Sequence, residues 1–184
     1  MAEITARKSL SGRNVFTMEI KIEKTKTPKA KPVDETKLGF GHIFTDHMFV
    51  MEYDTGKGWH DARIVPYGDI SISPAAMVLH YGQEIFEGMK AYRTPDGSIQ
   101  FFRPEENFKR MNISAERLVI PQLNVDDCLQ ALHELVKIDA DWVPHTDGAS
   151  LYIRPFIFAA DPFLGVRPGD KYYFCLLYTS DAAD

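Results

Sequence analysis

Long apolar runs are missing from this sequence of 184 residues. None approaches the ~18 residues that a membrane-spanning helix needs, so no such segment is predicted. The opening residues, MAEITARKSL, contain no apolar stretch followed by a small-residue cleavage site, which argues against secretion and predicts a cytoplasmic location. Basic residues are outnumbered, 21 against 26 acidic ones, and the net charge of −5 would repel a phosphate backbone, so nucleic acid is not a predicted partner.

Cysteine is scarce as well. Cys128 and Cys175 lie far apart and form no CxxC pattern, so the sequence predicts neither a zinc site nor a disulfide framework. We expect Cys128 to be a small apolar side chain on a helix. His42, Asp46 and His47 cluster in the sequence but lack the i, i+4 helical spacing of a metal site, so no metal is predicted.

The composition is that of a globular protein long enough for one ordinary domain, with 45% hydrophobic and 26% charged residues. Residues 1–38 are rich in Lys, Thr and Pro and show no sustained apolar period, so we predict a mobile leader with a short strand at 19–22. Two explanations stay open for residues 1–17. Either they are translated from DNA upstream of a true start at Met18, or they form a natural disordered tail.

Periodicity and turn residues predict the elements beyond Gly39. The predicted elements are a largely buried strand at 47–53, a helix that Ser73 and Pro74 open and Gly88 ends, a hairpin around a turn at 94–97, a helix from Pro104, a helix capped by Asn124, and a strand at 150–158. Pro155 interrupts the last strand, so we expect this strand to be an edge or to carry a bulge. Antiparallel strands with helices inserted between them predict an α+β fold, with an antiparallel sheet and flanking helices.

Two arginines are candidates for holding an anion. The guanidinium of Arg110 could bind phosphate oxygens bidentately, although an arginine on a surface helix is more often solvated or ion-paired. Arg154 shares a strand face with Ser150 and Tyr152 in an apolar segment, so it needs a partner if it is buried. An ion pair is the alternative to a ligand there.

Aromatic residues could line an apolar ligand pocket at Phe40, Tyr81 and Phe86. Tyr81 and Phe86 are five positions apart and do not share one helix face cleanly. Packing in the protein core is the alternative role for all three.

Five ordered strings resemble the branched-chain aminotransferases, which belong to fold type IV of the pyridoxal phosphate enzymes. The strings are LGFGHIFTDHMFVM at 38–51, LHYGQEIFEGMKAY at 79–92, FRPEENFKRM at 102–111, DWVP at 141–144, and SLYIRP with FLGV at 150–166. The resemblance extends over about residues 18–174. It implies that residues 39–174 form the small N-terminal domain of such an enzyme.

The resemblance implies roles for individual positions. Arg110 matches the arginine that grips the cofactor phosphate, and Arg154 matches a strand arginine that helps the site to accept glutamate. Leu164 and Val166 match a loop that, like the region of Tyr81, reaches across a homodimer to complete the partner's pocket. The positions that match apolar and aromatic walls for the substrate side chain are Phe40, Tyr81, Phe86 and Tyr152.

The activity that the resemblance implies is ping-pong transamination. Leu, Ile or Val would give its amino group to pyridoxal 5'-phosphate and then to 2-oxoglutarate, forming glutamate, with a Schiff-base lysine as proton shuttle. We expect that lysine in a second, larger domain beyond Asp184, so no catalytic residue is assigned here and this chain alone should be inactive. The alternatives are another fold type IV enzyme, such as a D-amino acid aminotransferase or aminodeoxychorismate lyase, and a stand-alone binding domain. The TDHM and DWV segments favour the branched-chain group.

The last ten residues, CLLYTSDAAD at 175–184, depart from the family pattern. They resemble the in-frame translation of a transposase library adapter. We therefore predict that this segment is not native.

Overall fold

The computed structural model describes residues 18–181. Its centre is a nine-stranded sheet with the strand order β1-β4-β3-β9-β8-β6-β7, in which β2 also pairs with β9 and β5 with β8. The strands are β1 (Lys21–Ile22), β2 (Phe40–Phe44), β3 (His47–Asp54), β4 (Gly58–Pro66), β5 (Glu84–Phe86), β6 (Met89–Arg93), β7 (Ile99–Phe101), β8 (Ser150–Ala159) and β9 (Lys171–Asp181). The helices are α1 (Met77–Tyr81), α2 (Pro104–Arg117) and α3 (Val125–Ile138), with 3-10 turns at Glu35–Lys37 and Ala140–Trp142.

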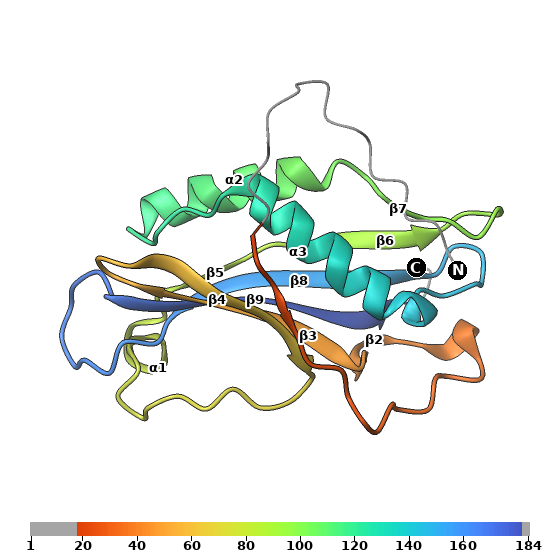
Figure 1. Cartoon of the computed structure of the whole chain (residues 1–184), viewed down its shortest axis with the longest axis horizontal. Coiled ribbons are helices and arrows are strands. Elements are labelled where there is room, and N and C mark those ends of the chain that lie inside the picture. The colour runs from red at the N-terminus through yellow and green to blue at the C-terminus, as the bar shows by residue number, and fades with distance from the viewer. Residues whose placement is uncertain (1–17, 182–184) are drawn as a thin grey trace.

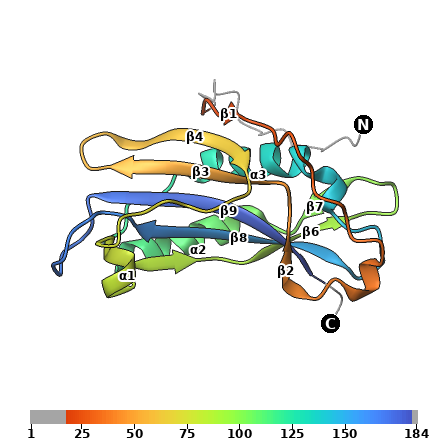
Figure 2. The ribbon, with the colours of Figure 1, turned by 90° about the horizontal axis from the view of Figure 1, so that it is seen from below.

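The sheet and helices form layers. Figure 1 shows α2 and α3 together on one face of the sheet and α1 on the other side, and the view from below in Figure 2 agrees. Within residues 18–181, every strand pair is antiparallel except β1 with β4. The predicted α+β fold with flanking helices is therefore confirmed. Over the same residues, no helix combines the length and apolar character that crossing a membrane requires.

Helices α2 and α3 form where the sequence predicts them. Pro104 opens α2, where a residue without N–H loses no helical hydrogen bond. The side chain of Asn124 caps α3 by accepting the backbone N–H of Asp126 (2.8 Å) and of Asp127 (3.2 Å). The side chains that the two helices bury are Phe108, Met111 and Ala115 on α2, and Cys128, Ala131, Leu132, Leu135 and Val136 on α3. Cys128 is only 1% exposed, which confirms its predicted role as an apolar side chain of the core.

Strand β8 lies inside the sheet and keeps one register with β9, so the prediction that it is an edge strand or carries a bulge is wrong. It pairs with β9 along its whole length, and on its other side with β6 at residues 151–153 and with β5 at 156–158. Pro155 falls in the gap between β5 and β6, where its carbonyl accepts the N–H of Glu87 (2.9 Å). Because N and C=O of a strand residue point to the same side, the missing N–H of Pro155 faces this gap and costs no bond to β9.

The prediction of one long helix from Pro74 to Gly88 is also wrong. Only α1 is helical, and it ends at Gly82, which adopts φ 61° in the left-handed region where glycine is favoured. The chain then extends as β5 and pairs with β8. Phe86 therefore stands on a strand and not on a helix.

The segment before residue 39 lies along the domain from residue 18 onward. The backbone N–H of Met18 donates to Gln130 Oε1 (3.0 Å), and Gln130 Nε2 donates to the carbonyl of Met18 (2.8 Å). Further on, the N–H of Lys29 donates to Asp46 (2.8 Å), and Leu38 is buried. The boundary between leader and domain at residue 38 stays a prediction. Residues 1–17, whose origin was left open, lie outside the described residues.

The segment from Cys175 onward continues β9, which lies between β3 and β8 in the middle of the sheet. Leu176 and Tyr178 are fully buried on the face covered by α2 and α3. Backbone pairing depends little on side-chain identity, and this segment is rich in residues that strands favour. Its non-native origin stays a prediction, and residues 182–184 lie outside the described part of the chain.

Candidate functional site

Four of the residues that the sequence predicted for substrate binding form one group on the sheet face opposite α2 and α3. We call Phe40, Phe86, Tyr152 and Arg154 the aromatic–arginine cluster. The Arg154 guanidinium carbon lies 4.3 Å from the centre of the Phe86 ring, a cation–π arrangement. Arg154 Nε and Nη2 donate to the hydroxyl of Tyr152 at 3.2 and 2.8 Å. The rings of Phe40 and Tyr152 meet edge to face, with centres 5.0 Å apart.

Strand geometry produces this group. Tyr152 and Arg154 are two positions apart on β8 and so point to the same face, as predicted. Phe86 of β5 is paired with Phe156, which makes it the diagonal neighbour of Arg154. Phe40 comes from β2 and is 53% exposed, so the cluster is open to solvent at that side. The predicted alternative of an ion pair for Arg154 does not occur within residues 18–181, where its partners are a phenol oxygen and two aromatic rings.

Two groups of the cluster can still donate hydrogen bonds to a ligand. The Tyr152 oxygen accepts from Arg154, so its hydroxyl hydrogen points elsewhere and remains available to donate. Arg154 Nη1 makes no hydrogen bond with the part of the chain that the structure describes. A guanidinium and a hydroxyl donor set between aromatic rings fit a ligand with a carboxylate at one end and apolar groups at the other.

Arg110 lies on α2, and its partner is the carboxylate of Glu87. Arg110 Nε donates to Glu87 Oε1 (2.7 Å) and Nη2 to Oε2 (2.5 Å), a bidentate pair. The hydrogen bonds that Arg110 donates to the Glu87 carboxylate raise the pKa of Arg110, so the guanidinium stays charged. The Arg110 side chain is 61% exposed, while that of Glu87 is 8% exposed.

The segment Phe86–Gly88 connects this pair to the cluster. Phe86 lies against Arg154, Glu87 binds Arg110, and a Cβ on Gly88 would collide with the Tyr152 hydroxyl and lie 3.0 Å from its Cζ. Sequence reasoning missed Glu87 and Gly88. Both stand in a stretch that had been predicted as helix, where neither burial nor close approach was expected.

Tyr81, Leu164 and Val166 lie apart from the cluster, on exposed positions of two adjoining segments. Tyr81 ends α1, and the loop between β8 and β9 carries the other two. The loop and the residues before α1 are joined by a bridge between Ala76 and Pro162. The exposed fractions are 43% for Tyr81, 66% for Leu164 and 90% for Val166. Their predicted part in a partner's pocket stays a prediction.

Two of the three residues considered for metal binding, Asp46 and His47, bind other protein groups. His47 Nδ1 lies 2.7 Å from Asp139 Oδ1, and His47 Nε2 accepts the backbone N–H of Thr25 (2.9 Å). Asp46 accepts the indole N–H of Trp142 (2.9 Å). In the described range, 18–181, no three His, Cys, Asp or Glu side chains converge as a metal site would require.

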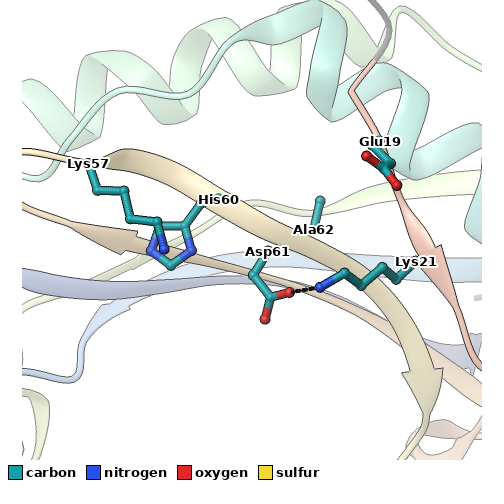
Figure 3. A pocket seen from close by; sticks show the side chains of 6 residues that line it. All are labelled: Glu19, Lys21, Lys57, His60, Asp61 and Ala62. Carbon is teal, nitrogen blue, oxygen red and sulfur yellow. Dashed lines mark hydrogen bonds and ion pairs between the residues drawn. The ribbon is translucent and has the colours of Figure 1, made fainter.

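A solvent-open depression of about 440 Å³ lies elsewhere, between β1 and β4 (Figure 3). It is lined by Glu19, Lys21, Lys57, His60, Asp61 and Ala62. Lys21 and Asp61 neutralise one another across it at 2.8 Å. It contains none of the predicted site residues, and its charged groups are well solvated, so the candidate site is the cluster and not this depression.

No family model matches the chain. The chain is 52% identical over 158 residues to branched-chain-amino-acid aminotransferase 2 of Bacillus subtilis (strain 168), a match that covers 86% of this chain and 43% of that protein. It is 51% identical over 158 residues to branched-chain-amino-acid transaminase 1 of the same organism, covering 86% of this chain and 44% of that protein. The chain thus spans less than half the length of these curated relatives.

A solved structure supports the same relationship. The T.th. branched-chain amino acid aminotransferase, solved with pyridoxamine 5'-phosphate, superposes with a TM-score of 0.53 at 27% identity, over 73% of this chain and 40% of that one. The likeness confirms the predicted fold. Over the residues that it contains, the chain belongs to the family of branched-chain-amino-acid aminotransferases.

Proposed function

We propose that the whole protein transfers the amino group of Leu, Ile or Val to 2-oxoglutarate with pyridoxal 5'-phosphate as its cofactor. The observation that carries this proposal is the Phe86–Gly88 segment, because three consecutive residues there meet Arg110 on one side and the aromatic–arginine cluster on the other. The group proposed to bind the phosphate and the group proposed to bind the amino acid would thus be neighbours. A transaminase needs both at one centre.

The donor set at Arg110 fits the phosphate of that cofactor. Its guanidinium is charged and largely exposed, and Nη1 makes no hydrogen bond with the described residues. Arg110 would therefore hold one edge of a phosphate, and other parts of the protein would supply the remaining donors. The neighbouring structure that contains pyridoxamine 5'-phosphate supports this choice of group. When bound, the cofactor supplies an electron sink for amino transfer.

The cluster would provide dual recognition of substrates. Phe40, Phe86 and the ring of Tyr152 offer apolar surface for a branched side chain and exclude water from it. The Tyr152 hydroxyl and Arg154 Nη1 offer donors for the second carboxylate of glutamate or 2-oxoglutarate. One site could then bind an apolar and an acidic substrate in turn, as ping-pong transfer requires.

The parent protein would work as a cytoplasmic homodimer. The exposed side chains of Tyr81, Leu164 and Val166 support this proposal, because apolar groups so open to solvent favour a protein partner. The Schiff-base lysine would come from a further domain, and the 184-residue chain alone would be inactive.

Two measurements test the proposal. Extending the gene sequence past codon 174 should reveal an open reading frame with a second domain and a lysine-bearing strand. The protein from that frame should form glutamate from leucine and 2-oxoglutarate, and Arg154→Met should raise KM for glutamate far more than for leucine. A frame without such a domain, or a full-length protein that binds pyridoxal phosphate but transfers no amino group from leucine, would refute the proposed activity.

A further inference from the structure

Glu87 is a buried carboxylate beside the proposed phosphate site. Its side chain is 8% exposed, and both of its oxygens bind the guanidinium of Arg110, which is itself 61% exposed. The pair is therefore unequal. The carboxylate of Glu87 is buried in the protein, and the guanidinium of Arg110 extends from it toward solvent.

The protein holds Glu87 in place from two sides. Its backbone N–H donates to the carbonyl of Pro155 on β8 (2.9 Å). The next carbonyl, that of Gly88, accepts from Asn107 Nδ2 (3.0 Å), and Asn107 lies one helical turn before Arg110 on α2. The position of the carboxylate is thus fixed relative to the helix that carries the arginine.

The bidentate pair uses only one edge of the guanidinium. Of the five N–H groups of an arginine, the pair occupies Nε–H and one hydrogen on Nη2. The opposite edge, formed by Nη1 and the second hydrogen on Nη2, has no partner among the described residues. That edge has the planar, two-donor geometry that suits a phosphate group.

We propose that Glu87 is a positioning residue, which fixes Arg110 so that its free edge faces the phosphate of the cofactor. This inference rests on the proposed function, because it takes Arg110 as the phosphate-binding group. A long arginine side chain loses conformational freedom when it binds a ligand, and an arginine that is already held loses less.

Removing the charge of Glu87 should change the phosphate affinity in opposite directions under the two possible effects. A carboxylate next to an anion site repels the anion, so removing its charge should strengthen phosphate binding if Coulomb effects alone decide. If Glu87 acts by orienting Arg110, removing its charge should weaken binding instead. The sign of the change therefore separates the two effects.

The experiment titrates the ¹⁵N-labelled 184-residue chain with inorganic phosphate and follows the Nε–H signal of Arg110. We expect phosphate to shift this signal in the wild type and not the backbone signals of the depression between β1 and β4. Glu87→Gln should weaken phosphate binding about tenfold, as expected for loss of a charge-assisted bidentate contact. It should also move the Nε–H signal upfield before phosphate is added, a signature of the broken pair.

Glu106→Gln is the matched control. Glu106 lies on the same helix, and Glu106→Gln removes the same charge. Its ion-pair partners are Lys109 (2.8 Å) and Arg103 (3.8 Å), and not Arg110. We expect phosphate affinity within about twofold of the wild type for this variant, since exposed pairs are weak. Glu87→Asp is a second variant that keeps the charge and shortens the side chain, and it should also weaken binding.

The outcomes are distinguishable. If phosphate does not shift the Arg110 signal in the wild type, the phosphate role of Arg110 fails and the inference fails with it. If the wild type binds but Glu87→Gln and Glu87→Asp bind as tightly or more tightly, the positioning role is overturned while the proposed function stands. If Glu87→Gln disturbs the backbone signals of α2, the affinity of Glu87→Asp decides between these outcomes.

Discussion

Asp139 offers the sharpest test of how the domain is held together. It is 3% exposed and binds His47 twice, through the ring Nδ1 (2.7 Å) and the backbone N–H (3.1 Å). Because Nε2 of His47 accepts the N–H of Thr25, Nδ1 of the neutral ring carries the proton and donates to Asp139. Asp139→Ala leaves two buried donors without an acceptor, at about 1.5–3 kcal/mol each. We expect the free energy of unfolding to fall by about 3–6 kcal/mol, out of a total of about 5–15 kcal/mol.

Urea unfolding followed by tryptophan fluorescence measures this loss. Hydrogen exchange gives a local readout, since the Thr25 amide should exchange faster once the His47 ring is free to turn. Asp141→Ala is the control, because Asp141 is exposed and lies two residues further along; it should change stability by less than about 0.5 kcal/mol. A loss below about 1 kcal/mol for Asp139→Ala, with unchanged exchange at Thr25, would refute the reasoning.

Three more predictions concern a hairpin turn, a thiol and a glycine. Hydrogen bonding by Thr94 lowers the pKa of Asp96 to about 2, below its unfolded value near 4, so its contribution to stability is complete above about pH 4 and is lost as pH falls toward 2. The urea midpoint should therefore drop less between pH 5 and 2 in Asp96→Asn than in the wild type. Burial raises the pKa of Cys175 to about 12, so a thiol reagent at pH 8 should label it only as fast as the protein unfolds, and rapid labelling of the native protein would contradict its burial. Gly88→Ala should displace Tyr152 and lower the free energy of unfolding by about 1–3 kcal/mol in a thermal melt, and an unshifted Tyr152 ring signal would count against the close approach.

Local signals predicted the elements that depend on them. Pro104 and Asn124 mark helix starts by chemistry within one turn, and the apolar stripes that follow repeat at helical spacing, so α2 and α3 could be predicted from sequence. The turn residues at 94–97 predicted the hairpin of β6 and β7 in the same way, and Gly97 there adopts φ 85°. Each of these signals acts over a few residues and needs no knowledge of the sheet.

Strand β4 was not predicted, and its bulge explains why. Val50 pairs with Arg63 and Glu52 with His60, so an extra residue stands on the β4 side of the register. Asp61 adopts φ 53° there, in the left-handed region. The bulge breaks the alternation of apolar and polar residues on which strand prediction relies.

The site was predicted in part. Strand spacing alone placed Tyr152 and Arg154 on one face. The sequence also offered Phe40 and Phe86 as possible pocket residues, and only the family resemblance favoured that role over packing in the core. The contact between Glu87 and Arg110 could not be predicted, because it depends on the turn between β5 and β6 and on the packing of α2 against the sheet. Contacts between residues 23 positions apart carry no local pattern.

The central place of β9 also constrains the order in which the protein can fold. Strands β3 and β4 form one hairpin, and β8 forms a second unit with β5, β6 and β7. Within the described sheet, backbone pairing links the two units only through β9. During synthesis, both units leave the ribosome before the strand that joins them, and until it arrives each presents an unpaired edge. Such edges recruit strands from other molecules. The newly made chain should therefore depend on chaperones most in the interval before β9 emerges. The pairing of β9 with β3, which lies far away in the sequence, should be the slow, long-range step of folding.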